Sequence, residues 1–325
     1  MTDLRLVGGQ LLPPATRERR HLLSVSDLNR DDVERILAAA RSFADSQERE
    51  TKKLPTLRGR VVLNVFYESS TRTSSSFELA AKRLSADTVT LRASGSSVEK
   101  GESLKDTALT LSAYDPDVIV LRHPEAGAAE LVARLTKARV VNAGDGKHQH
   151  PTQALLDLYT LRNTFGRLDG LQVAIVGDVA HSRVARSLVQ ALTLVGSQAI
   201  LVGPPALLPS GIAPVSHDIA AIADVDVVYV LRMQRERMLE GANFVPSLGE
   251  YRRYYGITAA RVRPGQFVMH PGPVNRGVEL DGDVADSEAS LILEQVRAGL
   301  VVRMAILYDL LTAGPVAVEA TVETA

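Results

Sequence analysis

The sequence contains no cysteine, which excludes disulfide bonds, thiolate zinc sites and cysteine nucleophiles together. Its longest apolar runs, such as Val225–Leu231, have the length of a strand and fall far short of a membrane span. The first residues lack the apolar core of a signal peptide, so we expect a cytoplasmic protein. A formal net charge of -1 gives no global attraction for nucleic acid or an anionic membrane, so any anion site must gather its cations locally.

Two nucleotide-binding patterns are missing as well. The segment Val176–Ser187 follows an apolar run, but it lacks the G-x-G-x-x-G spacing of a dinucleotide site, and a G-x-x-x-x-G-K-[ST] phosphate loop occurs nowhere. What is present is the composition of a soluble globular enzyme, with 45% hydrophobic and 23% charged residues. At roughly 150 residues per domain, the 325 residues predict two domains.

Apolar runs alternate with segments of helical periodicity from about Leu22 onward. The predicted strands are Val61–Tyr67, Thr88–Leu91, Val118–Leu121 and Val140–Asn142 in the first half, and Val173–Val176, Ala199–Val202, Val225–Leu231 and Phe267–Met269 in the second. Helices are predicted between them, including Pro151–Thr164 and a long last helix, Ser287–Leu311. This alternation predicts an α/β protein with two doubly wound parallel sheets.

The same pattern predicts where the domains divide. We expect a flexible arm over residues 1–20, a first domain over 21–165, a second domain over 166–286 and a loose tail over 313–325. The last helix, 287–311, is expected to return to the first domain and so to cross-link the two.

Polar residues follow the predicted strands at the sheet edge where ligands of open parallel sheets bind. The first strand runs into Ser70-Thr71-Arg72-Thr73 at the start of a helix, where hydroxyls, an arginine and free N–H groups make a phosphate cradle. Helix capping by serine and threonine is the competing interpretation. Arg122, after the third strand, adds a second cation at this edge.

A further strand end leads into G-D-G-K-H-Q-H-P-T-Q, where His150 and Gln153 share one face of the first helical turn. His148 and His150 also form a His-x-His pattern that could bind a metal. Such a site needs further ligands on other strand ends, and the remaining histidines fall in no ligand pattern, so we expect no metal.

The second half offers fewer but similar features. Arg183 and Arg232 follow two of its strands, and His270–Gly277 reads as a rigid turn that presents backbone carbonyls. Between the second strand and its helix lies Ser94–Glu102, which on its own reads as a flexible surface loop with a solvated lysine, Lys100.

Taken in order, these segments resemble the aspartate/ornithine carbamoyltransferase family over about Leu22–Leu311. The matching motifs are S-T-R-T, S-x-x-x-K-G-E, R-H-P, H-P-T-Q, G-D-x-x-x-S-R, R-x-Q and H-P-G-P. The resemblance implies that the first domain binds carbamoyl phosphate and the second binds the amino acid, with no metal or organic cofactor.

The resemblance also implies a role for each matching residue. Carbamoyl phosphate would be bound by Ser70, Thr71, Arg72, Thr73, Ser96, Arg122, His150, Gln153, Pro271, Gly272 and Pro273. Aspartate would be bound by Lys100, Arg183, Arg232 and Gln234. The residues expected to take part in catalysis are Arg72, Thr73, Lys100, Arg122 and His150. Ser96 and Lys100 would come from the neighbouring subunit of a homotrimer, which could also assemble with regulatory chains or a dihydroorotase.

The resemblance implies transfer of the carbamoyl group to aspartate, a step of pyrimidine biosynthesis. There are two alternatives to this function. Ornithine carbamoyltransferases use a cysteine in an H-C-L-P segment, whereas this chain has His270-Pro271-Gly272-Pro273 and no cysteine. Arg183 and Arg232 also suit a dicarboxylate better than a cationic side chain. The other alternative is a catalytically inactive scaffold, which we disfavour because every matched position holds a competent residue.

Overall fold

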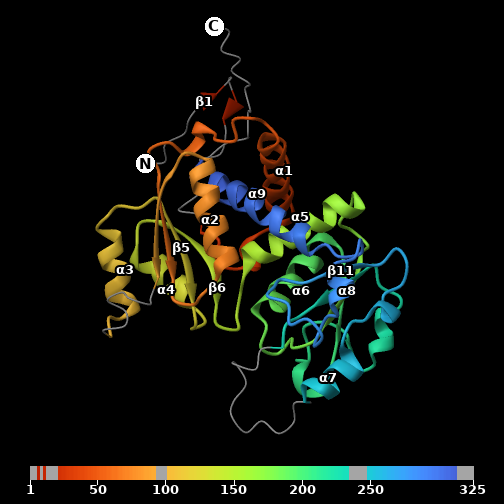
Figure 1. The fold of residues 1–325 in the computed structure, drawn as a ribbon. Helices are drawn as coiled ribbons and strands as arrows, with labels where there is room; N and C mark the ends of the chain where they lie inside the picture. Colours follow the sequence, from red (N-terminus) through yellow and green to blue (C-terminus); the bar gives the residue numbers. More distant parts are fainter. Residues whose placement is uncertain (1–5, 8–9, 12–20, 93–100, 234–246, 313–325) are drawn as a thin grey trace.

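The computed structural model describes residues 6–7, 10–11, 21–92, 101–233 and 247–312. Two short strands, β1 (Leu6–Val7) and β2 (Gln10–Leu11), pair antiparallel within the stretch expected to be an arm. The remainder of the described chain forms two α/β halves, side by side in Figure 1. No helix among the described residues is long and apolar enough to cross a membrane.

The first half is built on a sheet that has four parallel strands in the described chain, in the order β4-β3-β5-β6. These strands are β3 (Val61–Phe66), β4 (Asp87–Arg92), β5 (Val118–His123) and β6 (Arg139–Asp145). Its helices are α1 (Arg30–Gln47), α2 (Thr71–Arg83), α3 (Leu104–Ser112), α4 (Ala128–Leu135) and α5 (Pro151–Phe165). Alternate residues of β3 and β5 point to opposite faces, one packed against α3 and α4 and the other against the remaining helices.

The second half has five parallel strands in the part of the chain that the structure describes, in the order β11-β10-β7-β8-β9. These strands are β7 (Gln172–Val176), β8 (Gln198–Val202), β9 (Val215–Ser216), β10 (Val227–Val230) and β11 (Phe267–Met269). Its helices are α6 (Arg183–Val195), α7 (Leu248–Tyr255) and α8 (Gly282–Ala285). The parallel α/β architecture predicted for both halves is confirmed. Strand β9 and helix α8 were not predicted because they are short, and α7 was not predicted because its sequence is mostly polar and only Tyr251 in it is buried.

The last helix, α9 (Ile292–Leu311), begins at Ile292 rather than at Ser287. It packs against α1, α2 and α5, and so lies on the first half although it follows the second in sequence (Figure 1). One continuous hydrophobic core joins these helices to α6 and to the inner face of the second sheet. The packing therefore holds the two strand-end edges in fixed proximity.

Candidate active site

Each sheet has one switch point, where successive strands are added on opposite sides of a central strand. The two switch points face the same cavity. In the first sheet, β4 and β5 flank β3, so the carboxyl ends of β3 and β5 form the switch point. In the second sheet, β8 and β10 flank β7, so the ends of β7 and β10 form another. Residues at or just beyond the carboxyl ends of all four of these strands line a cavity of about 530 Å³. Open α/β sheets bind their ligands at such switch points.

Ser70 and the first turn of α2, Thr71–Thr73, line this cavity. Ser70 is the N-cap residue of α2, yet its side chain makes no capping hydrogen bond. Capping therefore does not explain its hydroxyl. Free N–H groups at a helix N-terminus, beside hydroxyls and a guanidinium, form an anion site.

Arg72 reaches across the cavity to the turn of the second half. A Cβ atom added to Gly272 would lie 2.6 Å from Arg72 Cζ, a distance that no real contact allows. Gly272 also has φ +69°, a conformation that side chains other than glycine rarely adopt. The glycine of the H-P-G-P turn thus lets the guanidinium of Arg72 lie directly against that turn.

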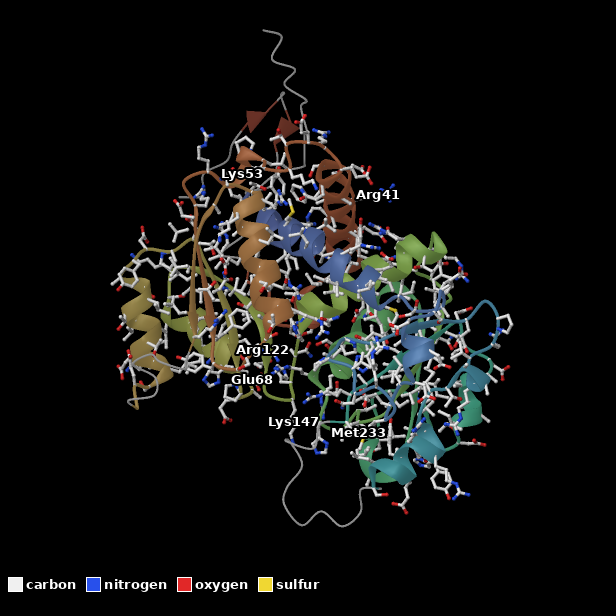
Figure 2. All side chains as sticks on the ribbon, viewed as in Figure 1. Arg41, Lys53, Glu68, Arg122, Lys147 and Met233 are labelled. Carbon is white, nitrogen blue, oxygen red and sulfur yellow. The ribbon has the colours of Figure 1, made fainter. Side chains whose placement is uncertain are left out.

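Glu68 connects cations from the two halves. Its Oε2 accepts a hydrogen bond of 2.5 Å from Nη2 of Arg183 on α6, and it lies 3.2 Å from Nε of Arg122 on β5. Glu68 and Arg122 lie together at the carboxyl end of the first sheet (Figure 2). One carboxylate therefore holds both guanidinium groups at the cavity wall.

Arg183 is buried against the first half, with 3% of its surface exposed. Its Nη1 donates to the carbonyl oxygen of Gly146 at 3.1 Å. A Cβ atom on Gly144 would lie 2.9 Å from Arg183 Nε, so a glycine is required where the end of β6 meets this side chain. The close approach fixes the direction of the guanidinium.

His150 is the N-cap residue of α5 and is buried, with 3% exposure. Its backbone N–H donates to Ser187 Oγ on α6 at 2.8 Å. Burial lowers the pKa of its imidazole well below the usual value, and the positive charges of Arg122, Arg183 and Arg303 lower it further. The ring is therefore neutral at physiological pH, and a neutral imidazole can donate one hydrogen bond to a substrate oxygen.

This depressed pKa makes a prediction about stability. In the unfolded chain His150 takes up a proton below about pH 6.5, whereas the folded chain resists that proton. The free energy of unfolding should therefore fall as the pH drops through 6.5, by at most about 1.4 kcal/mol per pH unit from this group. His150→Gln should reduce this dependence when urea unfolding is compared at pH 8 and pH 5.5. Identical pH dependence in both proteins would contradict the assignment.

Two buried charges in this region were not singled out from the sequence. Asp157 on α5 is completely buried, and burial raises its pKa to about 7. Arg303 on α9 is buried against Phe77, donates to Ser76 Oγ at 2.6 Å and has its pKa lowered by burial to about 10. Both stand alone in apolar helical segments, and a lone charge in such a segment was the available signal.

The charges that line the cavity are strongly one-sided. Among the described residues, its lining contains a single carboxylate, that of Glu68, and five arginines: Arg72, Arg122, Arg183, Arg232 and Arg303. A cleft lined mainly by charges of one sign attracts ligands of the opposite sign. The cavity is therefore built to receive anions with more than one negative charge.

The structure brings most of the predicted site residues together. Those that line the cavity are Ser70, Thr71, Arg72, Thr73, Arg122, His150, Gln153, Arg183, Arg232, Pro271, Gly272 and Pro273. The predictions for Ser96, Lys100 and Gln234 concern residues outside the described part of the chain. Other lining residues were not assigned from the sequence; they include Glu68, Ser76, Ser182, His270, Gln295 and Arg303.

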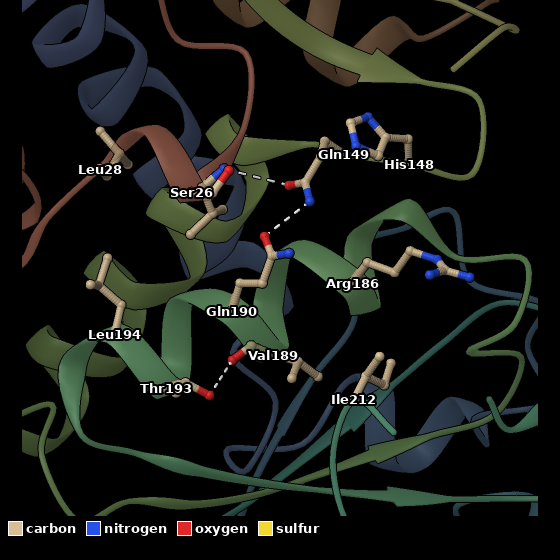
Figure 3. A pocket seen from close by; sticks show the side chains of 11 residues that line it. Ser26, Leu28, His148, Gln149, Arg186, Val189, Gln190, Thr193, Leu194 and Ile212 are labelled. Atoms are coloured by element: carbon tan, nitrogen blue, oxygen red, sulfur yellow. Dashed lines mark hydrogen bonds between the residues drawn. The ribbon is translucent and has the colours of Figure 1, made fainter. Parts of the chain in front are cut away.

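The two histidines of the His-x-His pattern lie in different surroundings. His150 lines the arginine-rich cavity, whereas His148 pairs with Asp145 at 3.0 Å and lines a second, mainly apolar cavity of about 570 Å³. Figure 3 shows that second cavity, where Gln149 Nε2 donates to Gln190 Oε1 at 2.9 Å. Within the described ranges, no three acidic or histidine side chains are grouped so that they could hold a metal ion.

Two switch points that share an arginine-lined cavity define a two-domain α/β enzyme that brings two anions together. The family model "Aspartate/ornithine carbamoyltransferase, carbamoyl-P binding domain" matches residues 20–163, and the model "Aspartate/ornithine carbamoyltransferase, Asp/Orn binding domain" matches residues 169–310. The chain belongs to the aspartate/ornithine carbamoyltransferase family.

Within this family, the relatives most similar in sequence and structure include aspartate carbamoyltransferases. The chain is 54% identical to an aspartate carbamoyltransferase catalytic subunit of Acidothermus cellulolyticus, over 91% of this chain and 93% of that one. It is 55% identical to the corresponding subunit of Salinispora arenicola, over 90% and 98%. A solved aspartate transcarbamoylase from Trypanosoma cruzi, in complex with carbamoyl phosphate and aspartate, superposes with a TM-score of 0.82 at 31% identity, over 92% and 98% of the two chains.

Proposed function

We propose that the chain transfers the carbamoyl group of carbamoyl phosphate to the α-amine of L-aspartate, giving N-carbamoyl-L-aspartate and phosphate, a step of pyrimidine biosynthesis. The observation that carries this proposal is the cavity in which five arginines face one carboxylate. Carbamoyl phosphate and aspartate bring roughly two negative charges each, so the pair needs such a surplus of cations. The similarity to aspartate carbamoyltransferases supports the same assignment.

The residues divide the work by their position. The Ser70–Thr73 turn, with Arg72 at its centre, is proposed to hold the phosphate. Arg122, His150 and Thr73 contact the carbonyl oxygen of the carbamoyl group. The N–H groups of the same moiety donate hydrogen bonds to Gln153 and to the backbone carbonyl oxygens of Pro271 and Gly272. Arg183 and Arg232 bind the carboxylates of aspartate, because a guanidinium fork pairs with two oxygens at once.

The reaction needs little beyond positioning and charge stabilisation. The neutral α-amine of aspartate attacks the carbamoyl carbon, the new C–N bond forms and the carbonyl electrons move onto oxygen. The tetrahedral intermediate then collapses, its C–O bond to phosphate breaks, and the leaving phosphate takes the bonding pair and the proton of the amine. Donors aimed at the developing oxyanion and a near-attack arrangement of two anions supply the rate enhancement.

Aspartate is preferred to ornithine on two grounds. Arg183 and Arg232 suit a second carboxylate, and the H-P-G-P turn carries no thiol. A colorimetric assay for N-carbamoyl products, run with aspartate and ornithine side by side, tests this. We expect product from aspartate only; no product at saturating substrates would favour an inactive scaffold.

Arg232→Ala should raise the KM for aspartate by roughly 10- to 100-fold, which corresponds to losing a hydrogen bond between charged groups. Turnover should also fall, while the affinity for carbamoyl phosphate alone stays nearly intact. Kinetics and calorimetry measure the two effects. Arg252→Ala, which removes an exposed arginine of α7 in the same half, serves as the control and should have neither effect. Lost carbamoyl phosphate binding in Arg232→Ala would contradict a role in binding aspartate.

We propose that the site is completed by a neighbouring subunit of a homotrimer. In the described chain, strand β4 is an outer strand of the first sheet, and it ends at Arg92, a few residues before Ser96 and Lys100 in the sequence. Val89 on β4 and Tyr114 after α3 are 51% and 69% exposed, and apolar surface at a sheet edge favours cover by another chain. The relatives are named catalytic subunits, which supports a second kind of chain in the assembly.

Mixing two inactive variants tests this shared site. Lys100→Ala and His150→Ala subunits, dissociated and reassembled together, should regain part of the wild-type activity. In a cyclic trimer that contains both variants, one interface can pair an intact His150 with an intact Lys100 from the neighbour. Demonstrated mixed trimers without any activity would show that Lys100 does not act across the interface.

A further inference from the structure

A layer of buried polar side chains lies beneath the cavity, between the two halves. Asp157 on α5 is at its centre, with 0% exposure. Its Oδ1 accepts hydrogen bonds from Gln153 Nε2 at 3.1 Å and from Gln295 Nε2 at 2.8 Å. Its Oδ2 accepts a hydrogen bond of 2.8 Å from the hydroxyl of Tyr229 on β10. The layer therefore connects α5, α9 and the second sheet.

The direction of these hydrogen bonds follows from one backbone group. The N–H of His270 can only donate, and it donates to Gln295 Oε1 at 2.9 Å. The amide of Gln295 is thereby oriented, and its Nε2 must face Asp157. Oδ1 of Asp157 then acts as an acceptor in either protonation state, because a bound proton would lie on Oδ2.

An acceptor at this position also fixes the next amide. Gln153 must turn its NH₂ group toward Asp157, since the opposite orientation would set oxygen against oxygen. Gln153 lines the cavity, so its Oε1, an acceptor, is turned away from Asp157 and toward a ligand there. A substrate group that meets Gln153 Oε1 is therefore required to donate.

We propose that Asp157 is a positioning residue that makes the site selective for the NH₂ group of the transferred moiety. Asp157 orients the Gln153 amide so that its Oε1 faces the cavity as an acceptor. Gln295, itself oriented by the backbone N–H of His270, fixes which oxygen of Asp157 accepts the hydrogen bond from Gln153. The proposal rests on the function proposed above, and it adds the residue that determines which acyl phosphates are accepted.

Acetyl phosphate is the matched probe, because it replaces the NH₂ of carbamoyl phosphate with a methyl group of similar size. Attack by the aspartate amine on its carbonyl carbon would give N-acetylaspartate and phosphate by the same bond changes. The methyl group cannot donate to Gln153 Oε1. A site built to receive a donor discriminates against an analogue that lacks it, because its own polar group is then left unpaired.

The experiment measures kcat/KM for both acyl phosphates in the assembled wild-type enzyme and in Asp157→Leu. We expect wild type to prefer carbamoyl phosphate, and Asp157→Leu to reduce that preference by at least ~10-fold, because the Gln153 amide is then free to rotate. Thr160→Val is the matched control: it removes a buried hydrogen bond within the same helix, from Thr160 Oγ1 to the carbonyl oxygen of Leu156, which involves neither Gln153 nor Asp157, and it should leave the preference unchanged.

A second pair of variants keeps the test decisive if Asp157→Leu does not fold. Asp157→Asn should retain the preference, since Gln295 directs the new amide oxygen toward Gln153. Adding Gln295→Leu to Asp157→Asn removes that direction and should lower the preference for carbamoyl phosphate.

Several outcomes would overturn the proposal. An unchanged preference in Asp157→Leu, or in the double variant, overturns the positioning role alone, provided that wild type is active and selective. An equal loss of preference in Thr160→Val would show a general packing effect and would also overturn it. A wild-type chain that transfers neither group to aspartate overturns the proposed function and this role with it.

Discussion

Arg72→Ala is expected to lower kcat/KM for carbamoyl phosphate by at least ~100-fold, the scale for loss of one preorganised donor to developing charge. The side chain lies in the first turn of α2, lines the cavity and is held against Gly272 of the second half. In the proposed role it meets the phosphate at the N-terminus of α2, beside free backbone N–H groups. Steady-state kinetics of the purified variant measures the effect.

Two comparisons make the Arg72 result specific. Arg72→Lys keeps the charge but lacks the planar fork, so it should recover only a small part of the activity. Lys82→Ala changes an exposed cation in the last turn of the same helix and should behave like wild type. Near-normal kinetics in a correctly folded Arg72→Ala variant would contradict the proposal that Arg72 binds the phosphate of the substrate.

His150→Ala should lower kcat by roughly 100-fold or more, while the affinity for carbamoyl phosphate changes little. The imidazole is neutral and buried, so in the proposed role it would donate to the carbonyl oxygen without adding charge to the ground-state complex. That hydrogen bond strengthens as the oxygen becomes negative, and an interaction of this kind affects turnover rather than binding.

Calorimetry with carbamoyl phosphate, together with kcat, separates the two roles of His150. His150→Gln retains a side-chain donor and should lose less turnover than His150→Ala. If His150→Ala instead weakened carbamoyl phosphate binding and left turnover unchanged, His150 would be a ground-state ligand.

The sequence predicted the framework of the fold because buried parallel strands are near-continuous apolar runs. Strands β3, β5 and β6 of the first sheet and β7, β8, β10 and β11 of the second overlap such runs, whereas β4 at the sheet edge alternates polar and apolar residues. Strand β9 has two residues and α8 has four, and segments of this length carry no usable periodicity. Turns at strand ends, such as Ser70–Thr73, were predictable because their chemistry is local.

The parts of the site that were not predicted depend on contacts between distant positions. Asp157 and Gln295 are 138 residues apart, and nothing in either local segment indicates that they meet. Arg303 pairs with Ser76 across 227 residues in the same way. Glu68 stood beside the S-T-R-T motif, but its role appears only where the second half brings Arg183 to it.

The position of α9 has a consequence for the order in which a growing chain can fold. Helices α1, α2 and α5 leave the ribosome early, but the helix that packs against all three is the last one made. At about 5–20 residues per second, synthesis from Gly166 to Leu311 takes on the order of 10 s. During that interval the apolar faces of these three helices lack their final partner and are open to chaperones or to other nascent chains. Folding of the first half therefore cannot be completed until α9 has been synthesised.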